Sequence, residues 1–301
     1  MSHHHHEEIT SAKSLIITMI LNFLITIVEV IGGILSGSLS LISDALHNFS
    51  DGIAVIISYF AIKLKSKDFS EKHTFGFKRA EILAAFINSS VLLLISAYLF
   101  YESVNRLLNP SEVSGGIMTL VAFIGLFANI AGTLLLKKGA SSSMNIKSSY
   151  LHLFSDAVSS AAVILGGIAI YLWQIYWLDP VLTILIALYV LKESYEILID
   201  SLHVLMEGTP KNISIEEIQK EVEALDEVTD IHHIHVWSVG EHDIHLEAHI
   251  NIKNMLTKES DLLRDKIVKI LHDKFEIAHP TIQFECGRCL GKGTINNNTE
   301  N

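Results

Sequence analysis

Two copies of one hexapeptide carry the residues of this chain that are best suited to bind a metal ion. Residues 46–51 are LHNFSD and residues 151–156 are LHLFSD, so the copies agree at five of six positions. Each copy places a His and an Asp four residues apart, which puts both side chains on one face of a helix. Two such faces brought together supply two imidazoles and two carboxylates, enough for a tetrahedral zinc site. The candidate ligands are His47, Asp51, His152 and Asp156.

Each hexapeptide lies inside a long apolar segment. Titratable groups at membrane depth are costly and are usually functional. A single His–Asp pair could serve only to hydrogen-bond neighbouring helices, and that interpretation stands for one copy taken alone. The repetition of the pair favours a ligand role for both copies.

The composition is that of a membrane protein with a soluble part. Half of the 301 residues are hydrophobic and the mean hydropathy is +0.40. The hydrophobic residues are concentrated before about residue 206, which predicts a membrane domain at 13–206 and a soluble domain at 207–290. The formal net charge of −11 argues against nucleic-acid binding, because that function needs a basic surface.

The membrane part contains six segments long enough to cross a bilayer core. They are 13–35, 39–64, 80–107, 114–137, 147–173 and 178–201. The connections at 63–79 and 137–147 hold most of the basic residues near these segments, and basic residues stay on the cytoplasmic side. We therefore expect a multi-pass membrane protein with both termini and the soluble domain in the cytoplasm. Such a compartment suits two reduced cysteines at C-x-x-C spacing, Cys286 and Cys289.

Several uncharged polar residues lie inside the predicted spans. We expect Asn22, Asn88 and Asn129 to join helices by interhelical hydrogen bonds and not to bind metal. Glu29 allows two interpretations: it lines a water-filled cavity, or it pairs with a neighbouring helix.

The soluble domain has the pattern of a small α+β unit. Ser214 and Glu217 form the signature of a helix start, and strands are expected near 228–238, 243–252 and 281–285. A helix at 257–275 would bury an apolar stripe of Leu262, Leu263, Ile267, Ile270 and Leu271. Residues 291–301 are polar and are predicted to be disordered. Residues 1–12 form a tail whose four consecutive histidines, 3–6, are either an expression tag or a native metal-capturing segment.

At this point the sequence resembles the cation diffusion facilitator family, and its zinc-transporting branch in particular. The resemblance covers nearly the whole chain after the His tract. Four segments carry it: SLSLISDALHNFSD (38–51), HTFGFKRAEILAA (73–85), SSYLHLFSDAVSS (148–160) and HHIHVWSVGEHDIHLEAHI (232–250). It implies six transmembrane helices followed by a cytoplasmic ferredoxin-like domain, a homodimer embedded in lipid, and export of zinc in exchange for protons. The short connection at 139–146 looks prokaryotic, which implies a plasma membrane location.

The resemblance also implies a second metal site in the cytoplasmic domain. His232, His249 and Glu285 match positions that bind regulatory zinc in relatives. Cys286 and Cys289 are further candidate ligands, with the N-terminal His tract as a possible contributor. The remaining histidines of this region are expected to be solvated surface residues: His233, His235, His242 and His245.

One metal site of the family is incomplete here. Some members bind metal in the loop after the second span through an Asp and two His. This chain has His73, but Phe77 and Ser70 stand near where the other two ligands would be. His73 is therefore expected to be a loop or dimer-contact residue.

Imidazole and carboxylate ligands suit zinc, and an imidazole adds coupling to protons. A ligating His must be neutral, and its unperturbed pKa is about 6.5, so protons and metal compete for it. Two alternatives from other classes remain. A membrane-embedded zinc enzyme needs an open coordination position, and the H-E-x-x-H motif is absent from the sequence. A metal sensor would leave the duplicated membrane motif unexplained.

Overall fold

The computed structural model describes residues 20–65, 70–136, 144–240 and 243–287. Some residues inside helices are described by their backbone only, and His152 is one of them. The predicted tails at 1–12 and 291–301 and the candidate ligand Cys289 lie outside the described residues. The chain forms two compact units, one of residues 1–59 and 87–198 and the other of residues 60–86 and 199–301.

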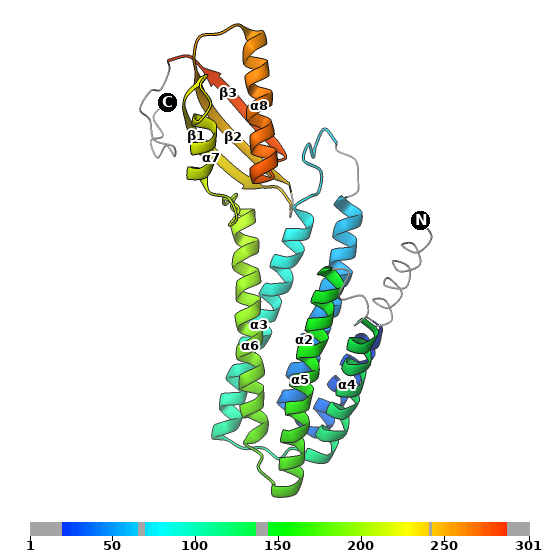
Figure 1. The fold of residues 1–301 in the computed structure, drawn as a ribbon. Helices are drawn as coiled ribbons and strands as arrows, with labels where there is room; N and C mark the ends of the chain where they lie inside the picture. Colours follow the sequence, from blue (N-terminus) through cyan, green and yellow to red (C-terminus); the bar gives the residue numbers. More distant parts are fainter. Residues whose placement is uncertain (1–19, 66–69, 137–143, 241–242, 288–301) are drawn as a thin grey trace, which may run out of the picture. The chain divides into compact units, whose positions relative to one another are not determined.

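Each predicted span contains a long helix (Figure 1). The helices are Ile20–Ser36, α2 Leu39–Lys65, α3 Ala80–Leu108, α4 Gly115–Leu136, α5 Met144–Trp173 and α6 Leu178–Leu205. Among the described residues, three stretches are long and apolar enough by themselves to cross a membrane: Ala80–Leu108, Gly115–Leu134 and Leu153–Trp173.

Helix α2 makes polar contacts with four other helices of the first unit, so it lies at the centre of their hydrogen bonding. The contacts are Asn48 with Glu29 of the first helix, Ser50 with Asn88 of α3, Asp44 with Ser159 of α5, and Ser38 and Ser40 with Asp179 of α6.

The start of α2 is held by a buried carboxylate from α6. Asp179 accepts hydrogen bonds from the Ser38 and Ser40 hydroxyls at 2.6 and 2.7 Å, and from the Leu39 and Ser40 backbone N–H groups at 2.8 and 3.2 Å. The first N–H groups of a helix have no intrahelical partner and carry partial positive charge, so a carboxylate there is stabilised. This contact ties the first turn of the helix that carries the first hexapeptide to α6.

Small residues let α4 and α5 approach closely. A Cβ atom on Gly115 would lie 2.6 Å from the carbonyl oxygen of Gly167, so neither helix could keep its place with a side chain there. Close backbone approach through small residues is the usual way in which membrane helices pack. The apolar contacts around this pair involve Leu41, Met118, Val163 and Ile170.

The interhelical role expected for the Asn residues is confirmed in one case and wrong in another. Asn88 accepts a hydrogen bond from the Ser50 hydroxyl at 3.0 Å and so joins α3 to α2. Asn129 is buried, but neither of its side-chain polar atoms has a hydrogen-bond partner among the described residues. Of the two interpretations of Glu29, the structure favours pairing with a neighbouring helix, because Asn48 donates to it at 3.1 Å.

The cytoplasmic domain follows the order α7 Ile215–Glu223, β1 Val228–Ser238, β2 Ile244–Ile252, α8 Thr257–Phe275 and β3 His279–Glu285. Strand β2 is central, antiparallel to β1 and parallel to β3. Among the described residues, this is the ferredoxin-like βαββαβ order without its first strand. Strand β3 begins two residues earlier than predicted, because His279 and Pro280 already pair with β2.

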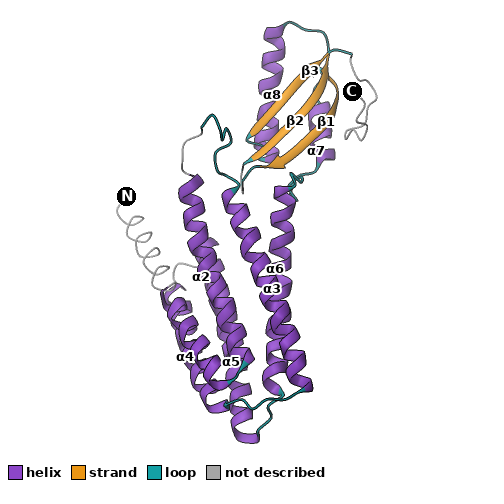
Figure 2. Ribbon diagram, turned by 180° about the vertical axis from the view of Figure 1, so that it is seen from behind, coloured by secondary structure: helices purple, strands orange, loops and turns teal. Residues whose placement is uncertain are grey.

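Helices α7 and α8 contact each other and cover one face of this sheet (Figure 2). The alternation along β2 behaves as predicted: Leu246, Ala248 and Ile250 are fully buried in the core with α8. The predicted stripe on α8 is wrong at Leu262, which is 62% exposed, and Phe275 extends the buried stripe instead. The other face of the sheet is left for polar side chains, and it carries the second candidate site.

Candidate functional site

Helices α2 and α5 bring the two hexapeptides together in the first unit. His47 Nε2 lies 3.5 Å from Asp51 Oδ2 on its own helix and 3.9 Å from Asp156 Oδ1 on α5. The side chains of His47 and Asp156 are 11% and 5% exposed, whereas that of Asp51 is 27% exposed. The fourth candidate, His152, lies on α5 one turn before Asp156, and its side chain lies outside the described ones.

These distances are close to those between the ligands of a tetrahedral zinc ion. Ligand atoms around tetrahedral zinc bond at about 2.0–2.2 Å, so neighbouring ligand atoms stand about 3.4 Å apart. The distances from His47 exceed that value by about 0.1 Å for Asp51 and about 0.5 Å for Asp156. A small approach of α5 to α2 would therefore bring Asp156 to the spacing from His47 that two zinc ligands have.

Two polar neighbours of this site were not identified from the sequence. Asp44, one turn before His47, is buried and accepts a hydrogen bond from the Ser159 hydroxyl of α5 at 3.3 Å. Asn48, next to His47, is 1% exposed and donates to Glu29. The signal was present, because Asp44 and Asn48 stand four residues apart and so share one face of α2.

The register of the cytoplasmic sheet assembles the second candidate site on the face away from α7 and α8. His232 of β1 pairs directly with His249 of β2, and Glu285 of β3 pairs with Asn251, two residues further along β2. Side chains two residues apart on a strand share a face. The ligand atoms of His232, His249 and Glu285 all lie within 4.8 Å of one another.

Two of the three separations between possible ligand atoms in this cluster are close to the spacing of zinc ligands, and the third is within 4.8 Å. His249 Nδ1 lies 3.1 Å and His232 Nε2 lies 3.6 Å from oxygens of Glu285. His232 Nε2 and the nearby Glu285 Oε2 are both buried, and neither has a hydrogen-bond partner among the described residues. This nitrogen and this oxygen face each other without a hydrogen bond, an arrangement that suits two ligands of one metal ion better than a direct contact.

Two neighbours orient these ligands, and the sequence did not identify them. Asp230 contacts His232 Nδ1 at 3.2 Å and leaves Nε2 facing Glu285. Gln283 donates a hydrogen bond to Glu285 Oε1 at 2.9 Å. Partners of this kind set the tautomer and the direction of a metal-binding histidine. Cys286 follows Glu285 but is exposed and lies outside the three-residue cluster.

An irregularity in β1 separates the neighbouring histidines. The pairing register shifts between His232 and His235, and His233 has a positive φ of 53°. His233 was expected to be solvated, but its ring stands 4.9 Å from that of His249, and partial burial lowers the pKa of its imidazole. That expectation is wrong for His245 too, which is stacked between Trp237 and His279.

The other histidine expectations had different outcomes. His235 is exposed, as predicted, and His242 lies outside the described residues. His73 is exposed in a turn closed by backbone hydrogen bonds with Ser70, and its ring lies 4.5 Å from that of Phe77, which agrees with a loop residue.

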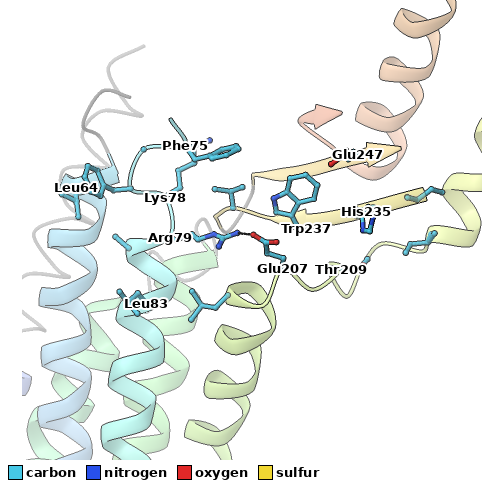
Figure 3. Close-up of a pocket in the computed structure, with 18 residues that line it drawn as sticks. Leu64, Phe75, Lys78, Arg79, Leu83, Glu207, Thr209, His235, Trp237 and Glu247 are labelled. Atoms are coloured by element: carbon cyan, nitrogen blue, oxygen red, sulfur yellow. Dashed lines mark hydrogen bonds and ion pairs between the residues drawn. The ribbon is translucent and has the colours of Figure 1, made fainter. Parts of the chain in front are cut away.

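The second unit also contains a cavity of about 960 Å³ that is open to solvent (Figure 3). Its walls carry Phe75, Leu83 and Trp237, and the ion pair of Arg79 with Glu207 crosses it at 2.9 Å. Among the described side chains, none of the candidate metal ligands lines this cavity. The described ligands of both candidate metal sites come together outside it.

Two family models match the chain. Residues 15–206 match the model described as the cation efflux transmembrane domain, and residues 210–286 match the cytoplasmic domain of cation efflux proteins.

Full-length relatives show the same similarity. The cadmium, cobalt and zinc/H(+)-K(+) antiporter of Bacillus subtilis is 38% identical over 285 residues, which is 94% of this chain and 91% of the relative. The zinc transporter ZitB of Pectobacterium atrosepticum is 37% identical over 292 residues, 96% and 90% of the two chains. A solved metal-bound C-terminal domain of the CzcD transporter from Cupriavidus metallidurans is 30% identical, with a TM-score of 0.22; the match covers 24% of this chain and 99% of that one.

Proposed function

Because this chain belongs to the cation efflux family, we propose that it exports zinc through the four-residue site on α2 and α5, in exchange for protons. Family membership confirms the resemblance drawn from the motifs. The chain is an integral membrane transporter that exports zinc, and it is not an enzyme. What remains a proposal is the identity of the site and of the coupling ion.

One observation supports the proposed site above all. His47 stands within 3.5 and 3.9 Å of carboxylates that come from its own helix and from α5. Two helices that share one ion can separate and return, so the same contacts that bind zinc also allow it to be released. Alternating access around such a site needs only a relative movement of the helices.

Proton exchange follows from the ligand chemistry. His47 and His152 bind zinc only as neutral imidazoles, so zinc and protons displace each other. One pH unit across the membrane supplies about 1.36 kcal/mol for each proton exchanged. An outside more acidic than the cytoplasm would therefore favour release of zinc outward.

The cytoplasmic cluster of His232, His249 and Glu285 is proposed to bind regulatory zinc, with Cys286 and Cys289 as further ligand candidates. The separations of the donor atoms support this assignment. We further propose a homodimer in a bacterial inner membrane, with both termini cytoplasmic and the boundary between the domains near residue 206.

Reconstituted vesicles test the proposal. Zinc, cadmium, cobalt and manganese would each be offered to wild-type protein with and without an imposed pH gradient. We expect zinc movement that a gradient accelerates and that Asp156→Asn abolishes. Glu196→Gln, which changes an exposed acid of α6, is the matched control and should transport normally. Zinc binding without any movement would instead indicate a metal sensor.

A further inference from the structure

Next to the proposed zinc site lies a buried carboxyl group that zinc binding does not use. We propose that Glu29 is a second proton-binding site, which releases its proton when zinc occupies the site on α2 and α5. The inference rests on the proposed zinc–proton exchange and adds a group outside the four ligands to it.

Glu29 is completely buried in the first helix. Its Oε2 accepts one hydrogen bond, from the neutral amide of Asn48, and its Oε1 has no hydrogen-bond partner among the described residues. An ionised carboxylate enclosed with a single neutral donor is strongly disfavoured, and a titratable group inside a membrane domain is a candidate for a functional role. A carboxylic acid would remove the buried charge.

The space around Oε1 points to a proton as the ligand and not to a metal ion. A Cβ atom built on Gly125 of α4 would lie only 2.5 Å from Oε1, so the glycine backbone packs directly against this oxygen. A bound cation would need several oxygen or nitrogen ligands at about 2 Å or more. Helix α4 contributes no titratable group at this contact.

The charged neighbours of Glu29 connect it to the zinc site. Asp44 of α2 and Asp156 of α5 both interact electrostatically with it. Asn48, its hydrogen-bond donor, directly follows His47 on α2. Zinc bound between His47 and Asp156 would add two positive charges to this region and would stabilise an ionised Glu29.

The proton release conserves atoms and electrons, and it compensates one of the two positive charges that zinc brings. As zinc arrives, the O–H bond of the Glu29 carboxylic acid breaks, the electron pair stays on the carboxylate and the proton leaves to water. When the proton returns, the carboxylate is neutralised and zinc is bound less tightly. Linkage is reciprocal, so each ligand lowers the affinity for the other by the same factor.

The competing explanation is that Glu29 and Asn48 only join two helices. Glu29→Gln separates the two, because the Gln side-chain oxygen can still accept from Asn48 but cannot titrate. If the contact is only structural, this variant should behave as wild type. If Glu29 carries a coupled proton, the variant should bind zinc with a different proton count.

The full-length protein would be titrated with zinc by calorimetry, in buffers that differ in ionisation enthalpy, to count the protons released per zinc bound. All variants would carry His232→Ala and His249→Ala, so that the cytoplasmic cluster does not contribute. Glu29→Gln should release fewer protons, by as much as one per zinc. The factor by which zinc affinity changes for each pH unit should then be smaller, by up to about tenfold. Glu102→Gln, which alters an acid paired with Arg106 on α3, should change neither quantity.

An infrared difference spectrum gives a second measurement should the variant unfold. The wild-type protein should lose a protonated-carboxyl band when zinc binds. Equal proton counts in Glu29→Gln and its parent, or no such band, would overturn the inference. Loss of zinc binding in Asp156→Ala tests the proposed site independently. A parent protein that binds zinc without releasing any proton would contradict proton exchange itself, and with it this inference.

Discussion

The two candidate metal sites use the same ligand types on different kinds of secondary structure. In the membrane unit, His47 meets Asp156 across two helices, and Asp51 keeps more than a quarter of its side chain exposed. In the cytoplasmic domain, His232, His249 and Glu285 lie on three adjacent strands of one sheet, and Asp230 and Gln283 hold two of them in place. Strands are joined by backbone hydrogen bonds, whereas α2 and α5 meet at the first site through side chains.

This difference predicts that the membrane site releases its zinc more easily than the cytoplasmic site does. A ligand pair shared by two helices opens when the helices move, and a transporter must release its ion. Ligands on one hydrogen-bonded sheet keep their spacing, which suits a site that reports the zinc concentration. The helix-borne site should therefore determine transport, and the sheet-borne site should determine regulation.

Removing one carboxylate from each site tests most directly whether the two sites have different roles. Asp156→Ala should reduce zinc transport to background and leave zinc binding to the cytoplasmic cluster intact. Glu285→Ala should weaken zinc binding to the cytoplasmic cluster and leave transport measurable, because we expect transport to use only the ligands on the helices. Vesicle uptake and calorimetry on both variants measure the two properties. Normal transport in Asp156→Ala would contradict the central proposal.

The next largest effect concerns which metal the membrane site accepts. His47→Asp replaces a single fixed nitrogen donor by a carboxylate that can bind through one oxygen or two. It also replaces a neutral ligand by one that carries a negative charge, so zinc and protons compete for a different group. We expect retained zinc transport, added cadmium transport and a changed pH dependence, measured by vesicle uptake.

Two results for this variant would count against that account. If cadmium is still excluded, His47 does not determine selectivity. If transport is lost for every ion, His47 is required for a reason other than coordination geometry.

Much of the fold followed from local patterns. Apolar segments longer than about 20 residues located the helices of all six predicted spans. Strand β1 has the predicted bounds, and period-two alternation located β2 to within one residue. The resemblance added the ferredoxin-like arrangement, and the sheet observed has that order without its first strand.

The partners of the ligands could not be predicted in the same way. Asp230 and Gln283 acquire their roles from strand register, and the shift after His232 interrupts the alternation that a pattern can detect. Asn129 failed as an interhelical contact because hydrogen bonding depends on how far each helix is rotated, which hydropathy does not record. The side chain of His152 and the whole of Cys289 lie outside the described residues, so their roles stay predictions.

A smaller effect is expected from changing the residue that orients His232 in the cytoplasmic site. Asp230→Asn keeps the shape of the residue that contacts His232 Nδ1 but removes its charge. Loss of such an orienting partner typically weakens metal affinity about 10–100-fold. Calorimetry should show that loss for the cytoplasmic zinc while transport persists. Asp226→Asn, an exposed residue before β1, is the matched control, and equal affinities in the two variants would contradict the orienting role.

The smallest expected effect concerns the other end of the same sheet face, where His245 is stacked between Trp237 and His279. Burial, and then the nearby His279 and Lys78, lower the pKa of His245 below its ordinary value of 6.5. The unfolded chain therefore binds a proton at this position more readily than the folded one. Stability should be complete above about pH 6.5 and should decrease as the pH falls below it.

His245→Phe keeps a ring in the stack but cannot be protonated, so it should flatten this decrease. The melting temperature would be followed through Trp237 fluorescence from pH 7.5 to 5.5, with Trp173→Phe and Trp177→Phe in every variant so that a single Trp reports. His272→Gln, which changes an exposed histidine of α8, should keep the wild-type slope. If His245→Phe keeps that slope as well, the acid sensitivity of this domain arises elsewhere. Histidines of the metal cluster would then be the next residues to test, because their protonation would remove the ligands that distinguish the sheet-borne site from the helix-borne one.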